Sequence, residues 1–504
     1  MSYAALVRHH QKLAQLEHLE AIVGWDEATM MPEGGGEARA EAMATLRGML
    51  HEQATLPALG DWYAKAESEA GGLGSWEAAN LREMKRGYAR ATALPQELVE
   101  ASSRAESKSE QAWRKLRKEN DWASFLPLQT EVFARKREVA HALSEKLGLG
   151  LYDALLDGYE PGGRSADIAV LFARLGQVLP GLIQAVLDRQ RSEAVVTPVG
   201  PFPVEEQRAL GLELMKRLGF DFRRGRLDVS HHPFCGGVPE DVRITTRFDE
   251  GDFAKALMGV LHETGHAKYE QNLPRAYLGQ PVGRARGMST HESQSLMLEM
   301  QVCRSAEFAT FSAPHLVAAF PGAAARTPEA FTVENLYLLS TRVRPGFIRV
   351  DADEVTYPCH VVLRFELEKA LVEGKLEVKD IPDAWDAGMQ RLLGLSTSGN
   401  FKDGCMQDVH WPAGLIGYFP TYTLGALTAA QLFQAAESNV TDLRASIAKG
   451  DIAPLDAFLR DKLWGEGSRL GTAELVVHAT GKPLGTDAFE RHIARRYLDA
   501  KGHG

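Results

Sequence analysis

Residues 253–269, which read FAKALMGVLHETGHAKY, determine how the rest of the chain is interpreted. The apolar residues in the first half of this stretch predict a buried helix. His262 and His266 are four residues apart, so a helix places both imidazoles on one face, where they can share a metal ion. Glu263 lies beside them and can take a proton from water. The spacing predicts a metal site, and the alternative is a helix whose two histidines bind no metal.

A third ligand must come from another segment, because a catalytic zinc site commonly has three protein ligands. A histidine ten residues after His262 would be one solution, but that position is Asn272. Residues 288–295, MSTHESQS, offer Glu292 in the first turn of a predicted helix. A glutamate there also suits the positive end of a helix without any metal, and Glu299 is a rival carboxylate two turns further on. The residue pattern leaves these alternatives open.

The segment before the metal motif predicts a strand. Residues 241–249, DVRITTRFD, alternate in polarity and carry β-branched side chains. Strand signals are scarce elsewhere, whereas leucines recur at helical spacing over residues 6–23 until Pro32 and the glycines at 34–36. Residues 37–149 are rich in helix-forming residues. The predicted fold class is therefore mainly α, with a small β-sheet next to the metal site.

The composition excludes several classes of protein. The chain has 504 residues, of which 44% are hydrophobic, which is typical of a folded core rather than of disorder. Lys and Arg number 57 against 67 Asp and Glu, so the net charge is −10, and we expect no nucleic-acid or membrane partner. We expect one unit over residues 1–504. A proline-rich connector at 195–203 suggests a subdivision into a helical part, 1–195, and a metal-binding part, 196–504.

Cysteine usage and the N-terminus predict where the protein is located. The four cysteines lie far apart with no Cys-x-x-Cys pair, so we expect neither a disulfide framework nor a cysteine zinc site. The N-terminus lacks the apolar core of a signal peptide. Arg174 and Gln177 interrupt the apolar residues 168–187, so we expect no membrane span. These features predict a cytoplasmic protein.

Further short motifs are spread over almost the whole chain. They are Gly24-Trp25-Asp26 with Met31-Pro32, His232-Pro233-Phe234, Asp241-Val-Arg243-Ile-Thr245, His262 to His266, His291-Glu292-Ser293-Gln294, Ile348-Arg349-Val-Asp-Ala352-Asp353 and Gly404-Cys-Met-Gln407-Asp408-Val-His410-Trp411. In this order the set resembles the carboxypeptidase Taq family of zinc metallocarboxypeptidases, relatives of the angiotensin-converting enzyme and neurolysin. The resemblance implies long helices that enclose a deep active-site groove, and a homodimer.

The resemblance also implies the metal ligands. His262, His266 and Glu292 would hold Zn²⁺, or Co²⁺, because the same nitrogen and oxygen ligands accept both ions. Glu299 would then support the site without binding the ion. His291 would pack beside a ligand or support it, rather than bind the metal.

Two arginines gain roles from the same resemblance. Arg349 is expected to bind the C-terminal carboxylate of a peptide, since a guanidinium offers a two-pronged fork to a carboxylate. Arg243, on the predicted strand, is expected to line the closed end of the groove. The peptide would be the substrate.

The segment from residue 410 to residue 422 supplies hydrogen-bond donors. In related enzymes a histidine and one or two tyrosines here stabilise the oxyanion of the transition state. His410 with Tyr418 or Tyr422 would do so in this chain. The sequence does not decide between the two tyrosines, and Tyr357 is a weaker third option.

These expectations predict a metal-dependent carboxypeptidase that releases single C-terminal amino acids from peptides with broad specificity, with Glu263 as the general base. The first alternative is a dipeptidyl carboxypeptidase or an oligoendopeptidase of the same fold, which would share the metal chemistry. The second is an inactive helical binding scaffold. A scaffold predicts the loss of a ligand or of the base, and this sequence retains the full set.

Overall fold

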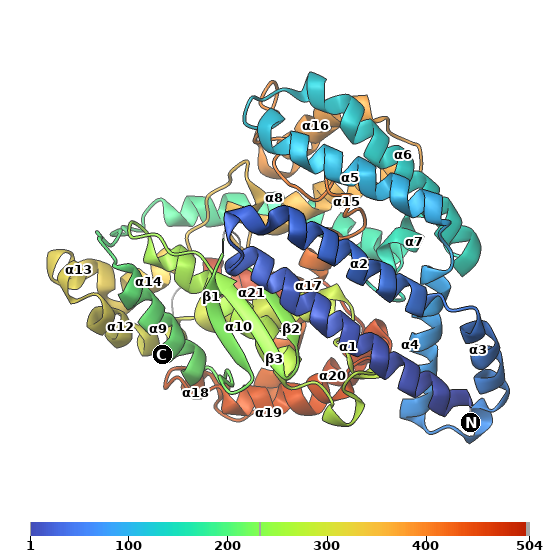
Figure 1. Cartoon of the computed structure of the whole chain (residues 1–504). Coiled ribbons are helices and arrows are strands. Elements are labelled where there is room, and N and C mark those ends of the chain that lie inside the picture. The colour runs from blue at the N-terminus through green and yellow to red at the C-terminus, as the bar shows by residue number, and fades with distance from the viewer. Residues whose placement is uncertain (1, 231–232, 500–504) are drawn as a thin grey trace.

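The computed structural model describes residues 2–230 and 233–499 and confirms a mainly helical fold with one small sheet (Figure 1). The helices before the sheet are α1 (Ser2–Thr29), α2 (Gly36–Ala54), α3 (Ala58–Ser68), α4 (Ser75–Ala91), α5 (Gln96–Leu116), α6 (Trp122–Leu147), α7 (Leu151–Leu156), α8 (Ser165–Gln190) and α9 (Val204–Arg217). Those after it are α10 (Phe253–Gln271), α11 (Met288–Leu296), α12 (Ala306–Ala319), α13 (Pro321–Arg326), α14 (Val333–Ser340), α15 (Tyr357–Val372), α16 (Ile381–Leu393), α17 (Pro420–Asn439), α18 (Leu443–Ile447), α19 (Ala453–Lys462), α20 (Thr472–Thr480) and α21 (Asp487–Ile493). Two π-helices, Met297–Cys303 and Ala494–Leu498, follow α11 and α21.

Within the described residues the sheet has three short strands in the order β1-β3-β2. They are β1 (Gly225–Val229), β2 (Cys235–Val238) and β3 (Asp241–Thr246), and β3 runs parallel to β1 and antiparallel to β2. The strand predicted from the sequence is β3, although it ends three residues early. His232 of the His-Pro-Phe motif lies outside the described residues.

The inner face of the sheet packs on the helix that carries the metal motif. Side chains alternate along β3, so Val242 and Ile244 face inward and are fully buried. They share a small core with Val260 and Ala267 of α10. The sheet thereby supports α10 from the side.

The outer face of the sheet binds the N-terminal helix. Arg226 of β1 and Arg243 of β3 are register partners, and their guanidinium carbons lie 5.0 and 4.4 Å from the ring centre of Trp25 in α1. Such cation–π contacts attach α1 to the sheet. The apolar face expected over residues 6–23 is only partly buried, because Leu6 is inside the core while Leu19 is 56% exposed.

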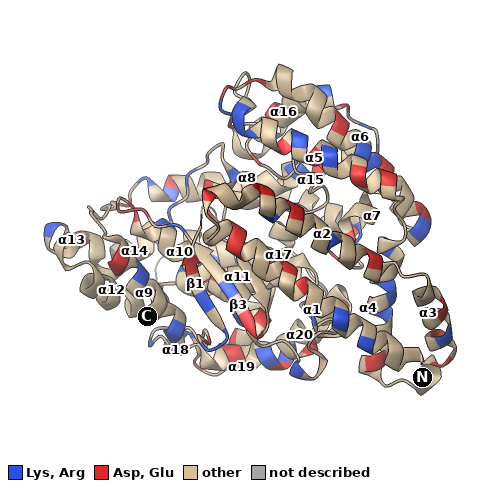
Figure 2. Ribbon diagram, viewed as in Figure 1, with Lys and Arg blue, Asp and Glu red and all other residues tan. Residues whose placement is uncertain are grey.

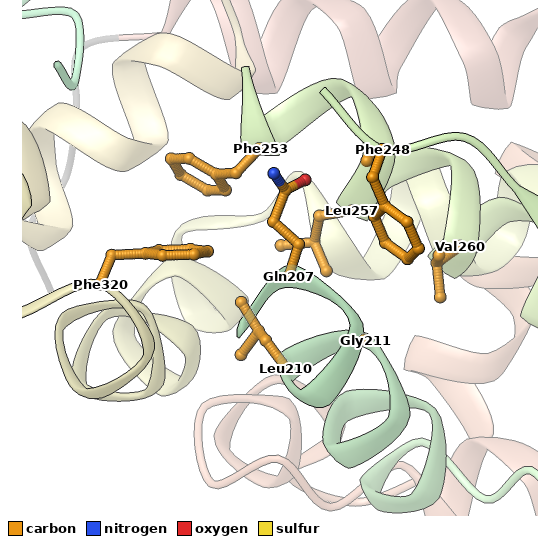
Figure 3. A pocket seen from close by; sticks show the side chains of 9 residues that line it. Gln207, Leu210, Gly211, Phe248, Phe253, Leu257, Val260 and Phe320 are labelled. Atoms are coloured by element: carbon orange, nitrogen blue, oxygen red, sulfur yellow. The ribbon is translucent and has the colours of Figure 1, made fainter. Parts of the chain in front are cut away.

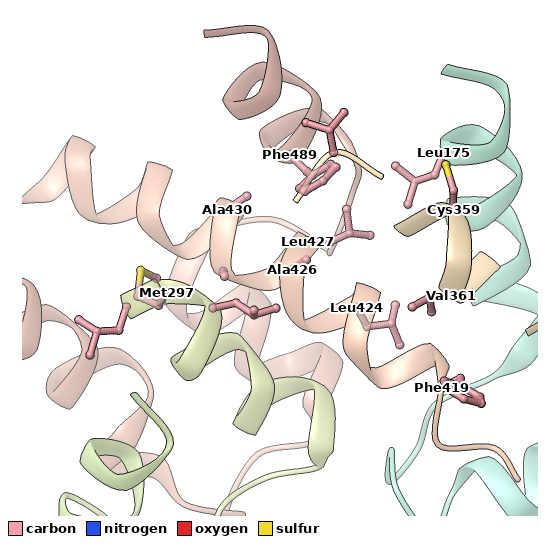
Figure 4. Close-up of a cluster of buried hydrophobic side chains, with 14 of the residues drawn as sticks. Leu175, Met297, Cys359, Val361, Phe419, Leu424, Ala426, Leu427, Ala430 and Phe489 are labelled. Atoms are coloured by element: carbon pink, nitrogen blue, oxygen red, sulfur yellow. The ribbon is translucent and has the colours of Figure 1, made fainter. Parts of the chain in front are cut away.

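Helix α11 lies between α10 and α17, and glycines allow both neighbours to approach it closely. A Cβ on Gly265 of α10 would lie 2.4 Å from the carbonyl oxygen of Gln294 in α11. A Cβ on Gly425 of α17 would lie 2.8 Å from Cγ of Glu292. Figure 4 shows part of the main core around α17, with Leu427 among the buried side chains.

Helix α8 is long and apolar enough, by length and composition, to cross a membrane, which we did not expect from its interrupted sequence. Its buried stripe, which includes Ile168, Leu175 and Leu179, belongs to the main core. On its exposed side Arg174 pairs with Glu490. One face of the helix therefore packs into the core of this fold.

Charges of both signs alternate along α5 and α6 (Figure 2). Several are helical pairs one turn apart, such as Arg114 with Glu110 at 2.6 Å and Arg135 with Glu131 at 2.9 Å. The four cysteines carry free thiols. The main core contains residues from both sides of the connector at 195–203, and the subdivision there stays a prediction.

The approach of α10 to α11 gives a prediction for stability. The methyl group of Gly265→Ala would push the backbone of α11 away from α10. We therefore expect the variant to lose about 1–3 kcal/mol of folding free energy, the usual cost of overpacking a core. Gly259→Ala is the matched control in the same helix, because its Cβ would meet only Pro233 Cγ at 4.0 Å. Thermal unfolding of the two variants beside the parent protein measures the difference. Equal midpoints for both alanine variants would contradict the close packing.

Candidate metal centre and active site

Three side chains from two helices converge at the centre of the site. His262 and His266 come from α10, and Glu292 comes from α11. Oε2 of Glu292 is 3.2 Å from Nε2 of His266 and 3.8 Å from Nε2 of His262. The ligand atoms of the three residues all lie within 4.8 Å of one another. Two imidazole nitrogens and a carboxylate oxygen at this spacing fit one divalent cation such as zinc.

The carboxylate of Glu299 orients His262 by contacting Nδ1 of its ring. Oε2 of Glu299 is 2.9 Å from Nδ1 of His262, and Oε1 of Glu299 accepts a hydrogen bond of 2.7 Å from Arg304. Burial raises the pKa of Glu299, but the charges of Arg304 and His262 outweigh it and lower this pKa to about 2. A charged acceptor at Nδ1 leaves Nε2 free for a metal. Glu299 therefore faces the edge of the ring away from Glu292.

A second histidine orients His266 in the same way. Nδ1 of His291 is 2.6 Å from Nδ1 of His266, and Nε2 of His291 is 2.8 Å from Oε1 of Glu270. Both contacts are hydrogen bonds when the Nδ1–H of His266 donates to Nδ1 of His291 and the Nε2–H of His291 donates to Glu270. Nε2 of His266 then faces Glu292. This geometry agrees with the supporting role expected for His291, while Glu270 was not singled out from the sequence.

Glu263 is buried beside the cluster, with 7% of its surface exposed. Burial raises the pKa of its carboxyl to about 7, with the positive charge of His262 opposing this shift and the negative charge of Glu292 adding to it. A carboxylate whose pKa lies near neutral pH suits a general base that later returns its proton.

Arg349 does not present the open fork that we expected from the sequence. Its Nε and Nη2 donate to Oδ1 of Asp408 at 3.1 and 2.9 Å, and Nη1 donates to the hydroxyl of Tyr357 at 2.6 Å. Arg364 donates to the other oxygen of Asp408 at 2.7 Å. Burial raises the pKa of Asp408, but the two arginines hold it well below its usual range. These bonds use three of the five N–H donors of Arg349, so the residue is anchored and two donors remain.

Asp408 belongs to the same motif as His410, but the motif alone predicts no role for it. A carboxylate that joins two arginines lying 59 and 44 residues earlier in the chain leaves no local signal. The neighbouring Gln407 adds a second contact, since its Oε1 accepts from the backbone N–H of Arg349 at 2.7 Å. The motif as a whole therefore holds the segment that carries Arg349.

His410 and the candidate tyrosines form one aromatic group. Nε2 of His410 is 3.1 Å from the hydroxyl of Tyr422, and the ring centres of Tyr418 and Tyr422 are 5.2 Å apart. Burial lowers the pKa of His410 to about 4, with the charge of Asp408 opposing this shift, so the imidazole is neutral at pH 7. Burial and the negative charge of Glu292 raise the pKa of Tyr418, so its phenol keeps its proton at neutral pH.

Arg243 is engaged within the chain. Its Nε and Nη2 donate to the two oxygens of Asp241 at 3.0 and 2.7 Å, and its guanidinium lies over Trp25. The structure thus gives Arg243 a role in attaching α1 to the sheet. That it lines the closed end of a groove stays a prediction.

Two cavities lie near α10 and the tyrosines. The larger has a volume of about 420 Å³ and is lined in part by Arg90, Lys136 and Tyr159. The ring centre of Tyr159 is 5.1 Å from that of Tyr418, so this cavity adjoins the aromatic group. The other, lined by Gln207 and Val260 among others (Figure 3), has about 10 Å³ and is too small for more than one water.

Comparisons with known proteins show the family of this chain. The sequence matches the carboxypeptidase Taq (M32) metallopeptidase family over residues 5–497. It is 40% identical to thermostable carboxypeptidase 1 of Thermus thermophilus over 99% of both chains. Trypanosoma cruzi metallocarboxypeptidase 1 is similar in structure, with a TM-score of 0.96 and 43% identity over 99% of both chains. The M32 carboxypeptidase from Deinococcus radiodurans has a TM-score of 0.93 and 35% identity over 98% of both. This chain therefore belongs to the carboxypeptidase Taq (M32) family of metallopeptidases.

Proposed function

We propose that this chain is a zinc metallocarboxypeptidase that releases single amino acids from the C-terminus of peptides. Its family and its relatives over the whole chain support a metallocarboxypeptidase. The observation that carries the assignment of the site is the cluster of His262, His266 and Glu292, whose ligand atoms lie within 4.8 Å of one another.

The three cluster residues would hold the ion through Nε2 of each histidine and a carboxylate oxygen of Glu292. When bound, a divalent cation here supplies Lewis acidity, which polarises the scissile carbonyl and lowers the pKa of water. Zinc is the proposed ion, because a site with two histidines and one glutamate is typical of zinc peptidases. Cobalt fits the same ligands.

Glu263 would take the proton of the attacking water and deliver it to the leaving amine. The raised pKa of this buried carboxyl, about 7, favours both transfers at neutral pH. His410 with Tyr418 or Tyr422 would donate hydrogen bonds to the developing oxyanion. Such a donor is typically worth about 2.7–4 kcal/mol in the transition state.

Arg349 would bind the C-terminal carboxylate of the peptide through its two remaining N–H donors. Asp408 and Tyr357 fix the guanidinium plane, so little side-chain entropy is lost when a carboxylate binds. The proposal also places Arg243 at the closed end of the groove. It further includes a homodimeric assembly and a cytoplasmic location. These three features rest on the resemblance to the family and on the composition of the chain.

Cleavage of matched peptides tests this function against its alternatives. Peptides with a free C-terminus should lose one residue at a time, and C-terminally amidated peptides should be poor substrates. Mass spectrometry of the products distinguishes the cases. Release of dipeptides would favour a dipeptidyl carboxypeptidase, and equal cleavage of both peptides would favour an oligoendopeptidase.

Replacement of the general base should abolish turnover without removing the metal. Glu263→Gln keeps the shape of the side chain but cannot accept a proton. We therefore expect kcat to fall about 10²–10⁴-fold, the usual contribution of general acid–base catalysis. Metal content measured on the same sample should equal that of the parent protein. If metal and activity fell together, Glu263 would instead be a ligand or a structural residue.

The two glutamates that follow α10 should differ in their effect on metal content. Glu292→Ala leaves two histidines alone, so we expect the purified protein to lose its metal. Glu299→Ala removes a hydrogen bond to His262, which should weaken binding about 10–100-fold yet leave the stoichiometry unchanged under saturation. Titration of both apo-variants with Zn²⁺ measures this. The reverse pattern would assign the ligand to Glu299.

Specificity for a free C-terminus should depend on Arg349. Arg349→Ala removes a charge-assisted interaction with the C-terminal carboxylate of the substrate, worth about 2–4 kcal/mol. We therefore expect kcat/KM for free-acid peptides to fall roughly 30- to 1,000-fold. Amidated peptides, already poor substrates, should lose much less. Arg349→Lys should recover only part of the loss, since lysine lacks the planar fork. A uniform loss on both kinds of peptide would indicate a packing role.

A further inference from the structure

Arg496, near the C-terminus, holds the backbone of a segment next to the metal cluster. The residue lies in the π-helix Ala494–Leu498, and its side chain is 8% exposed. Nη1 donates to the carbonyl oxygen of Met300 at 2.5 Å, and Nη2 donates to that of Gln301 at 3.3 Å. Both carbonyls belong to the π-helix Met297–Cys303. One guanidinium thus links two π-helices far apart in the sequence.

The π-helix that Arg496 holds also carries Glu299. Glu299 contacts Nδ1 of His262 at 2.9 Å, while Glu292 in the preceding helix lies 3.8 Å from Nε2 of the same ring. The imidazole therefore lies between two carboxylates of one continuous helical segment. π-Helical turns are rare and are frequent at functional sites. Here the turn sets the position of Glu299 relative to His262.

Arg496 is itself fixed by buried partners. Its Nη1 lies 2.9 Å from Oε1 of Glu354, which is only 1% exposed, and the other oxygen of Glu354 is 3.2 Å from Nε2 of His492. The backbone carbonyl of Arg496 accepts from the hydroxyl of Tyr337 at 3.3 Å. A guanidinium that is paired and hydrogen-bonded on several sides has one orientation, and it transmits that orientation to the carbonyls it binds.

We propose that Arg496 is a positioning residue for the metal centre. It holds the carbonyls of Met300 and Gln301, and this fixes the turn from which Glu299 orients His262. The inference rests on the proposed metal site. It predicts that a change more than two hundred residues away in the sequence, at a side chain outside the metal cluster, weakens metal binding.

Co²⁺ binding to the full-length apo-protein tests the proposal, by competition with a chelator and by the visible absorption of the bound ion. Arg496→Lys keeps a positive charge beside Glu354 but lacks the planar fork that reaches two carbonyls. We expect about tenfold weaker binding, the lower end of the effect of a supporting residue, and an altered absorption band. Arg495→Lys is the matched control, because Arg495 is 58% exposed and pairs with Glu437 on the surface.

A double-mutant cycle separates positioning from general destabilisation. If Arg496 acts through Glu299, then Arg496→Lys in a Glu299→Ala background, which lacks the contact with His262, should change Co²⁺ affinity less than about twofold, since coupled effects do not add. Arg496→Met repeats the test with a side chain that has neither the guanidinium of arginine nor the ammonium of the lysine variant. Parental affinity in the Arg496 variants, or the same fold-loss in both backgrounds, would overturn the proposal.

His262→Ala keeps this test distinct from the test of the proposed function. If His262→Ala binds Co²⁺ as tightly as the parent protein, the proposed metal centre is wrong. If His262→Ala loses Co²⁺ while Arg496→Lys retains parental affinity and spectrum, the metal centre stands and only the role of Arg496 fails.

Discussion

The close approach of α11 to α10 and α17 is the constraint on which the site depends. Glu292 reaches the two histidines only because its helix lies against its neighbours at glycine positions. Gly265 is inside the metal motif itself, and Gly425 faces the stem of Glu292. A methyl group at either position would overlap α11. The metal motif therefore has a packing function as well as a chemical one.

Around this centre, several buried charges are held in pairs. Burying an unpaired charge is strongly destabilising, so removing one partner of such a pair affects the whole group. Glu299 lies between His262 and Arg304 on the metal side. Asp408 joins Arg349 and Arg364 on the side where we place the substrate carboxylate. These pairs fix ligands and donors before substrate arrives, which is the arrangement that electrostatic catalysis requires.

The parts of the structure that follow from local spacing were predictable. The histidines of α10 and strand β3 are encoded by patterns of four and two residues, and they are found where expected. Strands β1 and β2 were missed because they are short, and β2 contains two glycines. The engagement of Arg349 by Asp408 joins residues 59 positions apart, and no local pattern encodes it. The choice of Glu292 over Glu299 came from resemblance to a family, since both lie in one continuous helical segment and local spacing does not separate them.

A crystal structure of the metal-loaded protein, with anomalous scattering at the zinc edge, tests the central claim most directly. The account predicts one strong peak about 2.0–2.2 Å from Nε2 of His262, Nε2 of His266 and a carboxylate oxygen of Glu292. Glu299 and His291 should remain on the Nδ1 sides of the two imidazoles. A peak bound by Glu299, or one away from α10, would contradict the account.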